Sequence, residues 1–293
     1  MSERFTIGTA GVSAQIDPAG AELVSLRDAG GTQLLWQGGA PWPRHAPVLF
    51  PIVGRLAGDT LRREGRSFRL TQHGFARDRR FERIEETPTR VALRLVDDDE
   101  TRARFPFRFT LDQIYEVEGA TLTVTTRALN SGQDVLPCGV GAHPAFRWPL
   151  ADGVAKEDHA IVFGAEEAGE VLSVEGGLLG PARPLPLEEG RVLRLSEPLF
   201  AADALVMPEV ASRSLRFVAL GRDGAPLREL AFSWEGYRDL GLWSKPEGAP
   251  FLCIEPWYSM ASPVGWDGEF AEKPGLLHLS PGESRSLTWR VSV

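Results

Sequence analysis

Cysteine is scarce in this sequence, and long apolar runs are absent from it. Its 293 residues include only two cysteines, Cys138 and Cys253. Both lie in apolar, strand-like segments, where a reduced and buried thiol is more common than a disulfide. No apolar stretch approaches the length of a membrane span, and residues 1–7 lack the charged and apolar regions of a signal peptide. We therefore expect a cytoplasmic protein that neither crosses a membrane nor is anchored to one.

Positive charge is also in short supply, because 40 acidic residues outnumber 32 basic ones and give a formal net charge of −8. Nucleic acids and anionic membranes are bound through a clustered positive field. The local run of Arg77, Arg79 and Arg80 is short, and a short charge run usually forms a solvated face. We expect neither a nucleic-acid partner nor a membrane partner.

Helical periodicity is missing as well. No window of about 12 residues carries a sustained helical apolar stripe, and 22 prolines with 31 glycines would interrupt most helices. Apolar and polar residues instead alternate with the period of a strand that buries one face. The clearest such segments are 91–95, 122–126, 215–219, 230–234 and 287–293. Turn signals such as Asn130-Ser131-Gly132 separate them.

This pattern predicts an all-β fold, a large antiparallel β-sandwich of two sheets packed face to face. Large β-sandwiches regularly reach this length as one unit, and a hydrophobic content of 43% supports a sizeable core. We expect a single domain covering residues 1–293. The stretch 164–190, rich in Gly, Glu and Pro, is expected to be a long excursion or a mobile loop.

Several common catalytic signatures are absent. The sequence has no GxSxG elbow, no glycine-rich phosphate loop before a helix and no CxxC pair. These absences argue against the commonest hydrolase, nucleotide-binding and zinc-ribbon classes. A glycosidase needs two carboxylates that flank the scissile bond, and only one carboxylate here has a suitable setting.

Three segments differ from ordinary strands and turns. Each places an ionisable residue in an apolar setting bounded by glycine or proline. They are 47–56 with 72–78, 139–146 and 251–257. Burial and neighbouring charges shift the pKa of an imidazole or a carboxylate, which is how catalytic acids and bases are tuned.

Glu255 is the sharpest candidate, because it ends an apolar run and precedes a proline and a tryptophan. Pairing with an arginine at a strand end explains this residue alone equally well. His143 and His73 alone are each explained by a bond to a backbone carbonyl, but together with Glu255 they favour a site. Trp257 is either core or a platform for a sugar. A metal site is not expected, because no short ligand spacing such as HxH or HExxH is present.

At these residues the sequence resembles the aldose 1-epimerase (galactose mutarotase-like) family, most closely its bacterial branch typified by LacX-like proteins. The resemblance covers nearly the whole chain. Its motifs are Phe50-Pro51-Ile52-Val53-Gly54-Arg55, His73-Gly74-Phe75-Ala76-Arg77, Gly141-Ala142-His143-Pro144-Ala145-Phe146 and Cys253-Ile254-Glu255-Pro256-Trp257. It implies a β-supersandwich with a sugar site in a cleft on a sheet face. It also implies interconversion of the α and β anomers of a hexose, with no cofactor.

The resemblance assigns roles to individual residues. His143 would be the acid that protonates the ring oxygen, and Glu255 the base that takes the proton of the anomeric hydroxyl. His73 would donate a hydrogen bond to the sugar. The other implied substrate-binding residues are Arg55, Arg77, Asp203 and Trp257.

Two alternative functions stay open. Arg77 and its basic neighbours also occur in relatives that act on hexose 6-phosphates, and an arginine fork suits a phosphate. The other alternative is a non-catalytic carbohydrate-binding or regulatory protein of the same fold, although the presence of both His143 and Glu255 counts against it. Many relatives have a histidine where this chain has Tyr258, which affects only substrate details. Asp203 fits a turn acid at a strand end as well as a sugar ligand.

Overall fold

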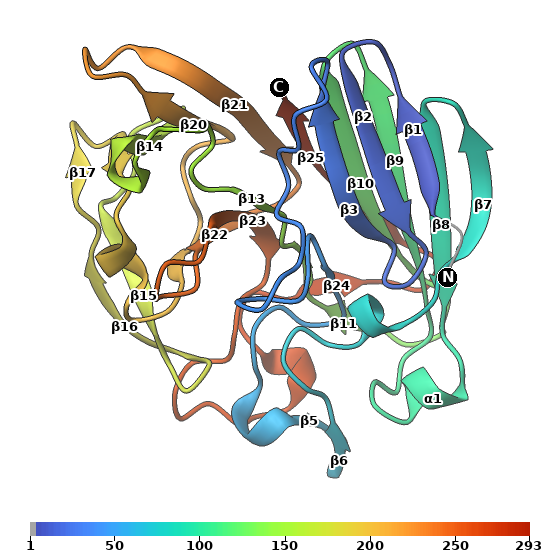
Figure 1. The fold of residues 1–293 in the computed structure, drawn as a ribbon. Coiled ribbons are helices and arrows are strands. Elements are labelled where there is room, and N and C mark those ends of the chain that lie inside the picture. Colours follow the sequence, from blue (N-terminus) through green and yellow to red (C-terminus); the bar gives the residue numbers. More distant parts are fainter. Residues whose placement is uncertain (1–3) are drawn as a thin grey trace.

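The computed structural model describes residues 4–293, and its named strands all pair antiparallel (Figure 1). Two large sheets dominate the described chain. The ten-stranded sheet has the order β17-β18-β14-β20-β21-β25-β10-β9-β8-β7. The eight-stranded sheet has the order β16-β15-β19-β22-β23-β12-β4, with β13 also paired to β23. The predicted all-β antiparallel sandwich is confirmed.

The ten-stranded sheet contains the segments in which apolar and polar residues alternate most clearly. Its strands are β7 (Glu82–Thr87), β8 (Arg90–Val96), β9 (Phe109–Glu118), β10 (Thr121–Asn130), β14 (His159–Phe163), β17 (Leu187–Glu188), β18 (Val192–Arg194), β20 (Ser214–Leu220), β21 (Pro226–Glu235) and β25 (Ser284–Ser292). In β8, for example, Val91, Leu93 and Leu95 are buried. Each such strand turns one apolar face to the core, as the period of two predicts.

The eight-stranded sheet carries the residues of the candidate site. Its strands are β4 (Val48–Leu49), β12 (Val140–Ala142), β13 (Ala145–Arg147), β15 (Glu170–Glu175), β16 (Leu178–Pro184), β19 (Leu205–Met207), β22 (Asp239–Trp243) and β23 (Phe251–Tyr258). The stretch 164–190, expected as an excursion or a mobile loop, instead supplies the hairpin of β15 and β16 at the edge of this sheet.

Smaller elements complete the structure. A three-stranded sheet of β1 (Phe5–Gly8), β2 (Val12–Asp17) and β3 (Glu22–Asp28) lies against β8 to β10 (Figure 1). Two further pairs are β5 (Thr60–Arg63) with β6 (Arg66–Arg69), and β11 (Leu136–Cys138) with β24 (Leu277–Leu279). The helices are α1 (Asp99–Arg102) and the 3₁₀ turns Ala57–Asp59, Ala76–Asp78, Lys156–Asp158, Glu197–Phe200 and Phe270–Glu272. None of the helices in residues 4–293 is long and apolar enough to cross a membrane.

Strand β23 is buried on both faces, which determines where the site can form. Leu252 and Ile254 point into the main core between the sheets. Because successive side chains of a strand point to opposite faces, Cys253, Glu255 and Trp257 project from the other face. Both cysteines of the chain are buried and free, which confirms the expected reduced thiols.

Candidate active site

His143 and Glu255 are far apart in sequence but face each other across neighbouring strands. Strands β12 and β13 both pair with β23 in one register, which puts Gly141 opposite Trp257. In an antiparallel pair, moving two residues forward on one strand corresponds to moving two residues back on the other. The same register therefore places His143, two residues after Gly141, opposite Glu255, two residues before Trp257. Side chains that are directly opposite on one face are close enough to interact. The His143 Nε2 atom lies 3.2 Å from a carboxylate oxygen of Glu255.

Burial controls the protonation of this pair. His143 is only 7% exposed and Glu255 only 2% exposed. Burial, together with the positive charges of Arg77 and Arg44, lowers the pKa of His143 to about 3. Burial raises the pKa of Glu255 well above its ordinary value, and the negative charge of Asp203 raises it further. The arrangement therefore favours a neutral imidazole beside a protonated carboxyl, so that the pair holds one proton.

Two tryptophans fix the orientation of the His143 ring. The indole of Trp42 stacks on the imidazole with ring centroids 4.8 Å apart and an interplanar angle of 25°. Trp243 meets the same ring edge-on, at 5.8 Å and 87°. Aromatic packing of this kind restricts ring motion and adds about 0.5–1.5 kcal/mol beyond area burial. Sequence reasoning missed both tryptophans, although a tryptophan between two prolines, as in Pro41-Trp42-Pro43, is an unusual signal for a loop.

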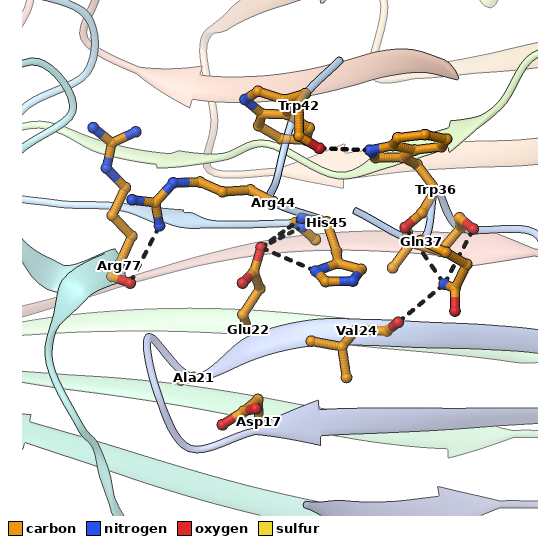
Figure 2. A network of polar contacts seen from close by, with 12 residues as sticks. Asp17, Ala21, Glu22, Val24, Trp36, Gln37, Trp42, Arg44, His45 and Arg77 are labelled. Carbon is orange, nitrogen blue, oxygen red and sulfur yellow. Dashed lines mark hydrogen bonds and ion pairs between the residues drawn. The ribbon is translucent and has the colours of Figure 1, made fainter. Parts of the chain in front are cut away.

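The loop that carries Trp42 is tied to the rest of the protein along its length (Figure 2). The Trp36 indole N–H donates to the Trp42 carbonyl at 2.9 Å. At the far end of the loop, one carboxylate oxygen of Glu22 accepts the backbone N–H groups of His45 and Ala46, at 2.7 and 3.0 Å. The half-buried indole of Trp42 beside His143 is therefore held in place by specific polar bonds to its loop.

The geometry around His73 decides which of its ring nitrogens carries the proton. The backbone N–H of Gly54 donates to His73 Nδ1 at 3.1 Å, so Nδ1 is an acceptor. Burial lowers the pKa of His73 well below its ordinary value, and the nearby His143, Arg77 and Arg44 lower it too. The ring is therefore neutral and carries its proton on Nε2. Because His73 lines the cavity described next, that N–H is available as a donor there.

A cavity of about 290 Å³ opens over this face of the eight-stranded sheet. An enclosed space with a few convergent polar groups and shifted pKa values is the usual form of a ligand site. Six of the seven predicted site residues line it, namely His73, Arg77, His143, Asp203, Glu255 and Trp257. Trp42 and Trp243 add two further aromatic walls.

Arg55 is the predicted residue that the structure does not bring into the cavity. Its guanidinium forms an ion pair with Asp59, with Nε 2.7 Å from the carboxylate. Its aliphatic stem lies behind Gly177, which lines the cavity, since a Cβ atom added at Gly177 would sit 3.1 Å from Arg55 Cδ. Arg55 thus supports the wall from outside.

Trp257 can lie flat on the sheet only because its neighbours are glycines. A Cβ atom at Gly241 would sit 2.3 Å from the Trp257 ring, and one at Gly141 would sit 2.8 Å from it. The indole also packs in a small apolar cluster with Val53 and Leu179. Trp257 therefore packs in the apolar core and also lines the cavity, so the two predicted roles, core residue and platform in the site, are compatible.

Arg77 and Asp203 supply charge at the cavity. Arg77 donates to the Gln72 carbonyl at 2.7 Å, while its Nε is buried without a hydrogen-bond partner among the described residues. Burial lowers the pKa of Arg77 to about 10, so the group stays positive at neutral pH. Asp203 is exposed, has a φ of +74° and accepts the backbone N–H of Ala204 at 2.9 Å.

The fold and the cavity match what the resemblance to the aldose 1-epimerase family implies. The model of that family, described as aldose 1-epimerase, matches residues 3–178. The chain belongs to this family.

Its relatives include proteins of the predicted LacX-like branch. The chain is similar to the chromosomal protein LacX of Lactococcus lactis subsp. lactis, with 27% identity over 292 residues that cover 96% of each chain. Among solved structures, it is similar to the galactose mutarotase related enzyme of Lactobacillus acidophilus, with a TM-score of 0.91, 29% identity and coverage of 99% of this chain and 97% of that one. A galactose mutarotase-like protein of Lactobacillus casei gives a TM-score of 0.89 and 27% identity, with 99% of both chains covered. The predicted family and branch are confirmed.

Proposed function

We propose that the protein is an aldose 1-epimerase that interconverts the α and β anomers of a hexose at the His143–Glu255 pair. The observation that carries the proposal is the 3.2 Å approach of an imidazole nitrogen and a carboxylate oxygen at one cavity. The ring oxygen and the anomeric hydroxyl of a hexose are bonded to the same carbon. An acid and a base that serve both oxygens must therefore lie within a few ångströms of each other.

In the proposed reaction the two residues exchange one proton through the sugar. The reactive form arises when the one proton of the pair moves from Glu255 to His143. His143 then gives that proton to the ring oxygen while the Glu255 carboxylate takes the proton of the anomeric hydroxyl. The bond from the anomeric carbon to the ring oxygen breaks, and an aldehyde forms. Rotation of the aldehyde and reclosure, with both transfers reversed, give the other anomer.

The proton count of the pair stays constant through this cycle. Ring opening leaves a neutral imidazole and a protonated carboxyl, which is the distribution that burial favours at this site. The pair therefore needs no proton from solvent between opening and closure. The aldehyde carbon is already an electrophile, so the proposed chemistry requires no cofactor. His73 Nε2–H would donate to the sugar, and the Asp203 carboxylate would accept from a hydroxyl.

A polarimetric assay tests the proposal. Optical rotation of freshly dissolved α-hexose relaxes slowly in buffer, and we expect the protein to accelerate this relaxation in proportion to its concentration. If the rate equals the buffer rate for several free and phosphorylated hexoses, the protein is not a mutarotase.

Arg77 favours a hexose 6-phosphate as the second candidate substrate. Its guanidinium lines the cavity, and its buried Nε has no hydrogen-bond partner among the described residues, with the Asp78 carboxylate 3.9 Å away. If a phosphate binds there, Arg77→Gln should lower kcat/KM for glucose 6-phosphate about 10–100-fold, the cost of one hydrogen bond to a charged group. The loss for glucose should be smaller. The matched control is Arg79→Gln, since Arg79 pairs with Asp98 and Glu100 away from the cavity; equal losses for both sugars would exclude a phosphate partner.

The pH profile follows from the shifted pKa values. The active pair holds one proton. Activity is therefore lost at low pH when the pair gains a second proton, so that both residues are protonated, and at high pH when the pair loses its only proton. Because burial lowers the pKa of His143, we expect the acid limb of kcat/KM to lie far below the ordinary histidine pKa of about 6.5. Initial rates between acid and neutral pH measure this limb. An acid limb centred at the ordinary histidine value would contradict the buried pair.

Removal of the Trp42 indole should mainly reduce the chemical step. In Trp42→Ala the His143 ring loses its stacking partner, and misplacement of a catalytic group by about 1 Å can cost up to about 10²-fold in rate. We expect a larger change in kcat than in KM. Trp36→Phe tests the support of the loop separately, because it keeps both aromatic rings but removes the N–H that holds the Trp42 carbonyl. Equal kcat in wild type and Trp42→Ala would show that stacking does not position His143.

A further inference from the structure

Cys253 joins the catalytic pair in space but has no part in the proposed reaction. It lies two residues before Glu255 on β23, so both side chains project from the same face. A nitrogen of His143, the sulfur of Cys253 and a carboxylate oxygen of Glu255 all lie within 4.8 Å of one another. All three residues are buried.

We propose that His143, Cys253 and Glu255 form an inhibitory site for a thiophilic divalent cation such as Zn²⁺. Imidazole nitrogen, thiolate sulfur and carboxylate oxygen are the three ligand types that zinc takes in proteins. Three protein ligands with a fourth position open to a cavity are typical of zinc sites that exchange water or small ligands. His143 and Glu255 line the cavity, which gives the ion a path to the site.

The separations suit a small ion after a modest movement. Zinc bonds of about 2.0–2.3 Å place tetrahedral nitrogen, sulfur and oxygen donors no more than about 3.6 Å apart. The His143–Glu255 separation of 3.2 Å already satisfies this limit. The remaining donors lie no further than 4.8 Å apart, so side-chain rotations that close about 1.2 Å complete the site.

Charge balance is met by proton release. Binding forms one bond each from the metal to nitrogen, sulfur and oxygen. The thiol proton of Cys253 and the carboxyl proton of Glu255 leave to solvent. The two negative charges that result offset the charge of the ion in a buried setting.

Such an ion would act as an inhibitor. It occupies the lone pair that His143 needs to accept a proton and the oxygen that Glu255 needs as a base. Metal and sugar therefore compete for the same atoms. The sequence contains no short metal-ligand spacing, so a metal site was not expected from it. The three donors come together only because β12 and β13 pair with β23.

Cobalt binding to the full-length protein tests the site without reference to activity. Co²⁺ bound to a thiolate gives a charge-transfer absorption band that carboxylate and imidazole ligands alone do not give. We expect this band with one Co²⁺ per chain in the wild type, and its reversal by Zn²⁺ or by EDTA. The matched control is Cys138→Ala, which removes the other buried free thiol, on β11, and should keep the band.

Two variants make the assignment. Cys253→Ala should lose the band, and Glu255→Gln should keep its thiol but bind Co²⁺ more weakly, by more than the 10–100-fold cost typical of an outer-shell partner. Near-ultraviolet circular dichroism establishes that each variant is folded. Absence of the band in the wild type at millimolar Co²⁺, or a band of equal affinity in Glu255→Gln, would overturn the proposal. Either result leaves the polarimetric test of the proposed function untouched, because cobalt binding requires no turnover.

Discussion

Replacement of Glu255 by glutamine is expected to slow mutarotation by about 10²–10⁴-fold, the usual contribution of a positioned general acid or base. Glutamine keeps the size and shape of the side chain but cannot take the proton of the anomeric hydroxyl. The loss should fall on kcat, because the cavity walls are unchanged and the sugar still binds. Polarimetry at several hexose concentrations separates kcat from KM.

The partner residue provides a stricter version of this test. His143→Gln should cost a similar factor, and the double variant should cost little more than either single change, because the pair acts as one unit. Glu235→Gln is the control, since Glu235 is an exposed glutamate at the end of β21. A Glu255→Gln protein that keeps a rate within about threefold of the wild type would rule out the proposed role of this carboxylate.

Addition of a single methyl group at Gly241 is expected to damage both stability and activity. The new Cβ atom would lie 2.3 Å from the indole of Trp257, so that ring must move. Overpacking of a well-filled interior typically costs about 1–3 kcal/mol. The displaced indole also enters the cavity beside Glu255, which should lower kcat/KM. Urea unfolding of Gly241→Ala measures the first effect, and polarimetry measures the second.

A second glycine distinguishes crowding from a general effect of alanine. Gly30 lies in a turn where a Cβ atom would meet only ordinary contacts, the nearest at 3.4 Å. We expect Gly30→Ala to unfold at nearly the same urea concentration as the wild type. An unchanged urea midpoint for Gly241→Ala would mean that Trp257 has room to move and does not depend on the glycine.

The strands of the sheets were predictable from the sequence because the alternation of apolar and polar residues within each strand depends on its own buried and solvent-facing sides. Alternation in segments such as 122–126 reflects one buried face and one partly exposed face, and no information about distant strands is required. The edge hairpin of β15 and β16 was missed because its glycines and prolines resemble those of a loop.

The site was only partly predictable, because it depends on which distant strands pair. Glu255 and His143 were each recognisable from an apolar setting, but their approach follows from the register of β12 and β13 on β23. Trp42 lies in a loop without periodicity, so nothing local indicated its contact with His143. Arg55 matched a motif, yet a carboxylate four residues later holds its guanidinium outside the cavity.

The two-faced burial of β23 links correct folding to competence for chemistry. A slip of one residue along this strand would exchange its faces. It would drive Glu255 into the apolar core and turn Ile254 toward the cavity, and a lone carboxyl in the core finds no compensating partner. A chain with this register error would thus be destabilised by Glu255, the residue to which we assign the role of catalytic base. Correct packing of Leu252 and Ile254 in the core therefore also places Glu255 at the cavity.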